Sequence, residues 1–445
     1  MDRFIENEIK LWLKESNKAL LVSGARQVGK TYTIRKVLNE LQLSYFEINF
    51  IENPDILKVF KETSDTKALI TRLRLYSPLP LKEKESIIFL DEIQEYPDII
   101  TKIKFLVDDG SFKYILSGSL LGVEIKNIRS IPVGYYTELR MYPMSFLEFL
   151  KAYGITNDVI ENINTCYLNE DTIDPIIHQK MLELFYYYLI VGGMPDVVKT
   201  FLETKNLVSI DNKAKDIINQ YKADFSKYEH NDKKLRIISI YDNITSQLNK
   251  QNQRFVFSYL NKELKFERYE NSFLWLKDAG VAYPCYIANE IKMPLAISKE
   301  KNMFKLFMND VGLLVSTLPF SFRTNILSNN TTNNGGLFEN FVMQELVFNG
   351  FIPYYYKSKK IGEIDFLIEK DDGIYALEVK SGKDFKSHKA LDSLIKEKEY
   401  QVSKYIVLSK SNLFKEGSIT YLPIYMCEFI KDLIPSKFIL PDIKF

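Results

Sequence analysis

Short apolar runs alternate with amphipathic segments over the first 150 residues. Four runs have the length and composition of buried strands, at residues 19–22, 44–50, 86–90 and 112–116. After Thr31, apolar residues recur every three or four positions, which predicts a helix with one buried face. Further helices are predicted over residues 3–14 and 52–76. Strands that alternate with helices predict an α/β fold built on a parallel sheet.

The hydrophobic pattern changes twice in the rest of the chain. Helical periodicity over residues 145–230 is broken at Gly154 and at the turn 192–195. Three shorter helices and two strands follow, at residues 234–248, 254–263, 265–279, 281–287 and 304–308. Three helices and a two-stranded ribbon are typical of a winged helix. A polar stretch over residues 328–336 reads as a loop and predicts a domain boundary.

The loop after the first strand carries the strongest motif. It matches the pattern G-x-x-x-x-G-K-[ST], in which glycines let the backbone approach an oxyanion and successive N–H groups point inward. The match consists of Gly24, Ala25, Arg26, Gln27, Val28, Gly29, Lys30 and Thr31. Lys30 is expected to reach the β- and γ-phosphates, and Thr31 to hold Mg²⁺. The sequence therefore predicts a P-loop that takes ATP and Mg²⁺ as cofactors.

Two later strands end in polar residues that suit the same reaction. The strand at 86–90 delivers Asp91 and Glu92 to the edge of the sheet where ligands bind in open α/β folds. Asp91 is expected to hold Mg²⁺ through water, and Glu92 to polarise the attacking water. After the strand at 112–116, Ser117 or Ser119 could sense the γ-phosphate or orient that water, although a plain strand-to-loop turn fits equally well.

The last hundred residues carry a second group of charged residues. A helix begins at residue 337, and strands at 362–368 and 375–381 are joined by a turn that makes them a hairpin. Glu339 lies on the helix, Asp365 on the first strand, and Glu378 and Lys380 on one face of the second. This order resembles the PD-(D/E)XK, or restriction-endonuclease-like, nuclease fold. Asp365 and Glu378 offer oxygen ligands for Mg²⁺ or Mn²⁺, completed by Glu339 or Glu345, and Lys380 would position the nucleophile.

Several motifs together resemble the bacterial and archaeal AAA-type ATPases that carry a C-terminal domain of unknown function. The motifs are GARQVGKT, IIFLDEIQ, ILSGS, LRMYPMSFLEFL and YLIVGGMPD. The resemblance implies a P-loop AAA-like parallel-sheet core, a helical lid, a winged-helix region and a restriction-endonuclease-like α/β domain. We assign these to residues 1–144, 145–231, 232–327 and 337–445. Many relatives have Gly-Arg where this chain has Gly134-Tyr135. If that arginine completes a neighbour's active site, it is missing here, and either Arg129 or Arg140 could substitute for it.

The overall composition says less than the motifs about whether the protein binds DNA, another protein or a membrane. A net charge of +1 creates no global field for nucleic acid, so contact with DNA depends on local patches. The patch on the third winged helix, Lys262, Lys265, Arg268 and Lys277, is interleaved with acidic residues, so DNA and a protein partner are equally good expectations. Lys222, Asp224 and Lys227 could approach the nucleotide, but charges solvated on a helix surface are the better expectation. The three cysteines are isolated, and no long apolar run predicts a membrane span, so we expect a cytoplasmic protein that forms no membrane contact.

Two functional hypotheses follow. In the first, the protein is an ATPase that couples hydrolysis to action on DNA through a winged helix and a nuclease-like domain. In the second, ATP binding drives a regulatory switch, and the C-terminal domain is an inactive platform for a protein partner. The sequence leaves a homo-oligomer possible in both.

Overall fold

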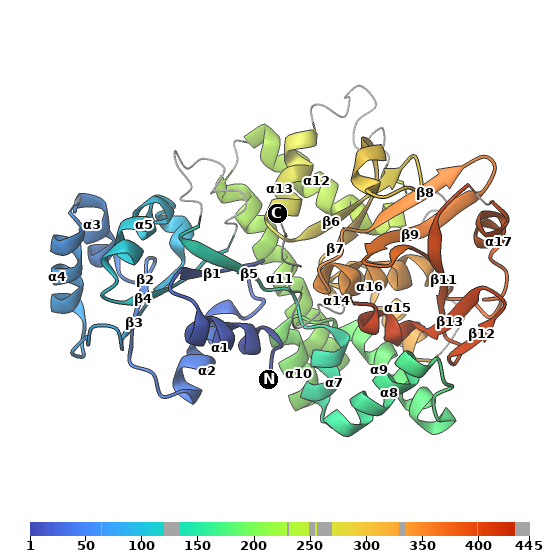
Figure 1. The fold of residues 1–445 in the computed structure, drawn as a ribbon, viewed down its shortest axis with the longest axis horizontal. Coiled ribbons are helices and arrows are strands. Elements are labelled where there is room, and N and C mark those ends of the chain that lie inside the picture. The colour runs from blue at the N-terminus through green and yellow to red at the C-terminus, as the bar shows by residue number, and fades with distance from the viewer. Residues whose placement is uncertain are drawn as a thin grey trace, which may run out of the picture. The chain divides into compact units, whose positions relative to one another are not determined.

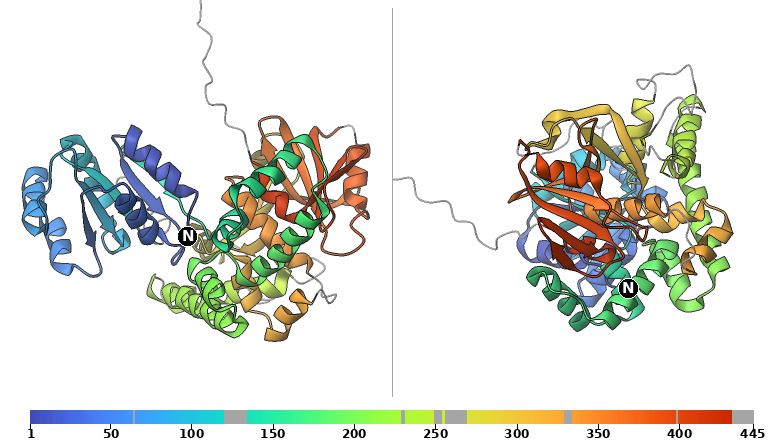
Figure 2. Two further views of the ribbon diagram at one scale, coloured as in Figure 1. Left: turned by 90° about the horizontal axis from the view of Figure 1, so that it is seen from below. Right: turned by 90° about the vertical axis from the view of Figure 1, so that its right-hand side faces the viewer.

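The computed structural model describes residues 1–63, 65–119, 134–228, 231–248, 254–255, 269–328, 334–397 and 399–431. Figure 1 labels its helices and strands, and Figure 2 gives two further views. The chain divides into two compact units, each assembled from three segments. The first comprises Met1–Asn157, Tyr186–Pro284 and Leu306–Thr332, and the second comprises Asp158–Phe185, Cys285–Lys305 and Asn333–Phe445.

The first unit is built around a five-stranded sheet in the order β2-β3-β4-β1-β5. Its strands are β1 (Ala19–Ser23), β2 (Tyr45–Asn49), β3 (Ile87–Asp91), β4 (Lys113–Ser117) and β5 (Tyr136–Arg140). All neighbouring strands run parallel, with Leu20 of β1 opposite Ile115 on one side and Thr137 on the other. The predicted parallel sheet is therefore confirmed. Because the strands are parallel, their carboxyl ends meet at one edge of the sheet.

Helices cover both faces of this sheet. The helices α3 (Pro54–Glu62), α4 (Thr66–Tyr76) and α5 (Ile99–Asp109) share one buried core with alternate strand residues such as Leu21 and Leu90. The helices α1 (Ile5–Glu15) and α2 (Lys30–Glu40) lie on the other face (Figure 2, left). The helical structure predicted over residues 52–76 is present, but it is divided into α3 and α4. The Asp65 side chain accepts the Ala68 N–H and begins α4 as a separate helix.

Further helices complete the first unit. They are α7 (Phe146–Tyr153), α10 (Pro195–Thr204), α11 (Leu207–Tyr228), α12 (Asn231–Leu248), α13 (Glu270–Asp278), α14 (Val311–Ser316) and α15 (Phe320–Leu327). A capping box begins α7: the Glu148 N–H donates to the Ser145 hydroxyl, and the Ser145 N–H donates to the Glu148 carboxylate. Gly193 sits where an added Cβ would lie 2.0 Å from the Met144 carbonyl oxygen, so only glycine permits this approach.

The second unit contains an eight-stranded mixed sheet in the order β12-β13-β11-β10-β9-β8-β6-β7. Its strands are β6 (Ala282–Ala288), β7 (Lys299–Met308), β8 (Tyr354–Ser358), β9 (Gly362–Lys370), β10 (Gly373–Val379), β11 (Val402–Ser409), β12 (Phe414–Glu416) and β13 (Ile419–Pro423). The predicted hairpin is present, because β9 and β10 pair antiparallel. The helices of this unit are α8 (Asn157–Asn169), α16 (Gly335–Phe348), α17 (Lys389–Lys396) and the first part of α9 (Pro175–Val191).

The region predicted as a winged helix is only partly described. The predicted helix at 254–263 and the start of the next one lie outside the described residues, apart from Arg254 and Phe255. Strand β6 pairs parallel with β8 at Tyr286 and Ile287, so β6 and β7 extend the eight-stranded sheet. The winged helix and the four segment boundaries stay predictions.

None of the described helices alone is long and apolar enough to cross a membrane, and only the bent pair α9 and α10 reaches that length and composition together.

Candidate nucleotide-binding site

The phosphate loop joins the end of β1 to the start of α2 at the carboxyl edge of the parallel sheet. Gly24 has φ +146°, and a Cβ there would lie 2.2 Å from the Met141 carbonyl oxygen. Gly29 caps α2 with φ +95°, a left-handed conformation that favours glycine. The two glycines thus keep the loop closely folded over the start of a helix, where backbone N–H groups and the helix dipole favour an anion.

Lys30 is buried in this loop with only 7% of its surface exposed. Its Nζ donates to the Gly24 carbonyl (3.0 Å), the Ala25 carbonyl (2.8 Å) and the Ser119 hydroxyl (3.0 Å). Burial lowers the pKa of Lys30 to about 8, against the opposing charges of Glu92 and Asp91. None of these three hydrogen-bond acceptors carries a formal charge, so a bound phosphate would supply the compensating anion.

Asp91 ends β3 beside the first turn of α2. Its Oδ2 accepts the Thr31 hydroxyl at 2.9 Å, and its Oδ1 accepts the Ser117 hydroxyl. Parallel pairing of β3 with β4 brings together the two strand ends that carry Asp91 and Ser117. A hydroxyl and a carboxylate oxygen in contact are ligands that suit Mg²⁺, so Thr31 and Asp91 fit the ion that a P-loop requires.

Glu92 follows in a left-handed conformation with φ +55°. The Gln94 amide donates to the Glu92 carboxylate, and its carbonyl accepts the Ser119 N–H at 3.2 Å. Gln94 therefore ties the proposed water-activating carboxylate to the loop that contacts Lys30. The sequence analysis missed this role, although Gln94 lies two residues after Glu92.

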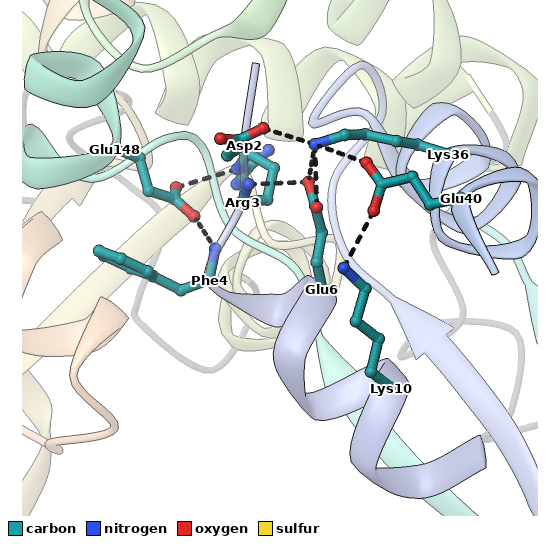
Figure 3. Close-up of polar contacts among 8 residues, drawn as sticks. All are labelled: Asp2, Arg3, Phe4, Glu6, Lys10, Lys36, Glu40 and Glu148. Atoms are coloured by element: carbon teal, nitrogen blue, oxygen red, sulfur yellow. Dashed lines mark hydrogen bonds and ion pairs between the residues drawn. The ribbon is translucent and has the colours of Figure 1, made fainter. Parts of the chain in front are cut away.

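The N-terminal segment supports the phosphate loop from outside. The buried Arg3 donates to the Val28 carbonyl (2.8 Å), the Tyr142 carbonyl (2.6 Å) and the Glu148 carboxylate (2.9 Å). Figure 3 shows Glu148 reaching both Arg3 and the Phe4 N–H, and it shows Lys36 of α2 among acidic residues of α1 and α2. Sequence reasoning missed Arg3, because no local pattern links residue 3 to residues 28 and 148.

Helix α11 contacts the outer side of the loop. The Arg26 guanidinium pairs with Asp224 at 2.9 Å, and the Tyr221 hydroxyl donates to the Arg26 carbonyl at 3.1 Å. Gln27 also hydrogen-bonds Gln220. Asp224 is only 4% exposed, so the expectation that its charge is solvated was wrong. The helix presents its polar face to the phosphate loop instead.

A cavity of about 570 Å³ opens beside the phosphate loop within the first unit. Gly29, Tyr32, Met144 and Pro195 are among its lining residues. Gly29 and Tyr32 flank Lys30 and Thr31 in the sequence, so the cavity adjoins the phosphate-binding end of α2. Its size lies within the range of small-molecule sites.

A second cluster of charges lies in the other unit, around Lys305 of β7. This ammonium is 1% exposed, and it lies 3.2 Å from Glu339, 2.9 Å from Glu363 and 3.8 Å from Asp365. Burial opposes the charge, but the three carboxylates outweigh it and hold the pKa of Lys305 well above its usual value. Sequence reasoning missed Lys305 and Glu363.

The other predicted residues of this cluster are also brought together. The second Asp365 oxygen accepts the Val379 N–H at 2.8 Å, and Lys380 donates to Glu378 Oε1 at 2.8 Å. Glu378 Oε2 is buried with no hydrogen-bond partner. Burial and the nearby Asp365 raise the pKa of Glu378 to about 8. Glu345 is fully buried on α16.

These residues do not fit a divalent metal ion as they are arranged. Across the described part of the chain, no group of three or more His, Cys, Asp or Glu side chains is placed to hold a metal ion. The Lys305 ammonium lies among the carboxylates that a metal would need. The metal-binding roles of Glu339, Asp365 and Glu378 stay predictions.

Comparison with known proteins assigns the first sheet to a class. Residues 16–150 match the family model of an AAA domain. Residues 182–324 match one domain of unknown function (DUF8612), and residues 334–427 match another (DUF4143). The AAA match covers the phosphate loop, Asp91 and Glu92. The chain therefore contains an AAA-type P-loop ATPase domain, followed by two domains of unknown function.

Solved structures give weaker likenesses. A Walker-type ATPase of Pyrococcus abyssi is 16% identical with a TM-score of 0.45, over 71% of this chain and 95% of that chain. The Drosophila ORC bound to DNA is 10% identical with a TM-score of 0.29, over 74% and 96%. A structure of katanin self-assembly is 17% identical with a TM-score of 0.20, over 34% and 49%. All three scores lie below 0.5, so the class rests on the family model and the site. No curated protein matches this chain.

Proposed function

We propose that the protein is an Mg²⁺-dependent ATPase that acts as a switch, and that its C-terminal unit is a binding platform. The observation that carries the ATPase part is the contact between Thr31 and Asp91 beside a lysine with neutral partners. Lys30 would exchange its carbonyl partners for phosphate oxygens. Glu92, held by Gln94, would accept a proton from the attacking water.

The remaining site residues have supporting roles in this proposal. Bound Mg²⁺ would neutralise phosphate charge, held by Thr31 and Asp91. Ser117 keeps Asp91 oriented, and Ser119 contacts Lys30 where the γ-phosphate would lie. The cavity beside Gly29 and Tyr32 would take the base and ribose, because it continues from the phosphate-binding end of α2.

The proposal that the second unit is a binding platform is supported by the buried Lys305 among its carboxylates. Lys305 already balances the carboxylates there, so a metal ion is not needed to stabilise them. Three exposed lysines of this unit are paired with carboxylates: Lys357 with Glu363, Lys360 with Glu397 and Lys386 with Glu416. Both observations favour a protein partner over nucleic acid for this unit.

The competing hypothesis is an ATPase that acts on DNA through a winged helix and a metal-dependent nuclease. The test measures Mg-ATP hydrolysis with and without duplex DNA, with Lys30→Ala as the control. We expect slow hydrolysis that requires Lys30 and does not change with DNA. Strong stimulation by DNA would support the competing hypothesis. Metal-dependent DNA cleavage that disappears in Asp365→Ala would contradict the platform directly.

A further inference from the structure

We propose that Tyr32 binds the nucleobase of ATP by stacking its phenol ring on it. The inference rests on the proposed ATPase function and goes beyond it, because it names the group that distinguishes a nucleotide from a bare polyphosphate. Tyr32 is the third residue of α2. It therefore directly follows Lys30 and Thr31, the two side chains that would contact the phosphates and Mg²⁺.

The side chain of Tyr32 lies on the open side of α2. It is 61% exposed, whereas Lys30 and Thr33 are 7% and 1% exposed. Side chains of a helix lean toward its N-terminus, so a residue of the first turn covers the start of the helix rather than its middle. The Tyr32 ring is thus directed toward the phosphate-binding end of α2.

Tyr32 lines the cavity of about 570 Å³ that adjoins this end of α2. Met144 and Pro195 contribute apolar atoms to the same lining. A Cβ at Gly29 would lie 3.6 Å from Pro195 Cγ, so α10 begins close to the end of the phosphate loop. A planar base in this cavity therefore meets the ring of a tyrosine and the ring of a proline, both beside the phosphate site.

The Tyr32 ring is available to a ligand. In the described part of the chain, its side chain takes part in no hydrogen bond, ring contact or cation–π contact. The cation in the cavity wall, Arg3, is by contrast committed to Val28, Tyr142 and Glu148. A single exposed aromatic elsewhere on a surface needs no explanation. At this position it leaves one π-face open where the base would lie.

Stacking suits a nucleobase for a general reason. Every base has a π-face, and a tyrosine ring offers a large contact area at little cost in side-chain entropy. The base lies at the opposite end of ATP from the γ-phosphorus, so this contact is equally strong before and during phosphoryl transfer. Tyr32 should therefore raise the affinity for ATP without raising kcat.

The experiment compares purified full-length Tyr32→Ala and Tyr32→Phe with the wild type. Tyr32→Ala should weaken binding of a non-hydrolysable ATP analogue with Mg²⁺ by between about fivefold and 150-fold, the range of one base–aromatic stack. KM for ATP should rise by the same factor, while kcat stays within about threefold. Tyr32→Phe should bind like the wild type, because it keeps the ring.

Inorganic tripolyphosphate separates stacking from a structural role. It carries three phosphates and no base, so its affinity should agree within about twofold between the wild type and Tyr32→Ala. An equal loss of tripolyphosphate and ATP-analogue binding would mean that Tyr32 only supports the loop, which overturns the inference. Tyr76→Ala is the matched control. It removes another exposed tyrosine, 48% exposed at the end of α4, and should leave both affinities unchanged.

The identity of the base gives a second measurement. Because stacking requires only a π-face, Tyr32→Ala should weaken binding of ATP and GTP analogues by similar factors, and that of a UTP analogue, with its smaller ring, by less. A loss confined to the ATP analogue would indicate a hydrogen bond to adenine and contradict stacking.

Failure of the inference is distinct from failure of the proposed function. Unchanged affinity for the ATP analogue in Tyr32→Ala overturns the inference and leaves the proposed ATPase function intact. A wild type whose ATP hydrolysis equals that of Lys30→Ala contradicts the proposed ATPase function, while the binding comparison still decides the role of Tyr32.

Discussion

Lys30 and Lys305 are both buried lysines, yet their surroundings differ in one respect. The partners of Lys30 are two carbonyl oxygens and a hydroxyl, whereas Lys305 lies among three carboxylates. Desolvation disfavours the charge of both side chains. The pKa of Lys30 is lowered to about 8, while that of Lys305 is raised well above its usual value.

This difference separates a lysine that can bind a ligand from one that holds the fold together. A buried ammonium with neutral partners is stabilised by an incoming anion, because the anion provides the negative charge that the surrounding protein groups lack. An ammonium already surrounded by carboxylates gains little from another anion and excludes a cation. We therefore expect the two lysines to respond oppositely to the same substitution.

The largest expected effect is on catalysis at Lys30. Lys30→Met should lower ATP hydrolysis by at least about 10³-fold, because it removes a positioned donor to the transferring phosphoryl group. Stability should hold or rise, since methionine has no buried charge. Trp12 and Trp275, the two tryptophans of the sequence, both belong to the first unit, so tryptophan fluorescence during urea unfolding measures that unit. A large loss of stability would place Lys30 in the same class as Lys305.

The next effect is on stability at Lys305. Lys305→Met should lower the free energy of unfolding of the second unit by about 3–5 kcal/mol, because three buried or partly buried carboxylates lose their cation. Hydrogen exchange of peptides from β7 and β9 measures this locally. Adding Glu363→Gln to Lys305→Met should recover part of the loss. An unchanged exchange rate in Lys305→Met would mean that the carboxylates are already neutral.

A smaller effect is expected at Asp310, a fully buried carboxylate that has no ion-pair partner in the described part of the chain. It accepts the Gly193 N–H at 2.6 Å and the Leu313 N–H at 2.9 Å. Burial nevertheless raises its pKa from 3.8 to about 6. Its stabilising contribution is thus full below pH 3.8, declines as the pH rises, and is lost above about pH 6. The loss should be about 2–3 kcal/mol.

Tryptophan-detected unfolding between pH 4 and pH 7 measures this dependence. Asp310→Asn should flatten it, because the amide does not titrate. It should also lower stability at all pH values by about 1–3 kcal/mol, because an amide offers only one acceptor oxygen for two N–H donors. If both proteins show the same pH dependence, Asp310 is not the titrating group.

Local patterns predicted the first sheet and the strand ends where the candidate site residues lie. Apolar runs correspond to β1 to β4, the motif places Lys30 at the start of α2, and the ends of parallel strands bring Asp91 to Ser117. These features share a cause, since strand ends and motif spacing are set by neighbouring residues. The break between α3 and α4 was missed because the apolar periodicity runs through it, while the Asp65 cap decides the boundary.

Contacts between distant segments could not be predicted in the same way. Arg3 meets the phosphate loop and Glu148, and Lys305 meets residues of α16 and β9. Nothing near residue 3 or residue 305 in the sequence marks it as a buried cation. In both cases the partner is selected by the topology, which a single sequence does not reveal. The pairing of β6 with β8, rather than with β7 alone, has the same origin.

The interleaving of the two units has a consequence for protein synthesis. Residues 158–185 and 285–305 belong to the second unit, but they are translated before most of its strands. During synthesis these two segments therefore emerge before the residues that bury them in the second unit. Because of this chain order, the last segment, Asn333–Phe445, is not by itself the whole second unit. Cutting the chain near residue 333 leaves Lys305 and all of β7 on the other fragment.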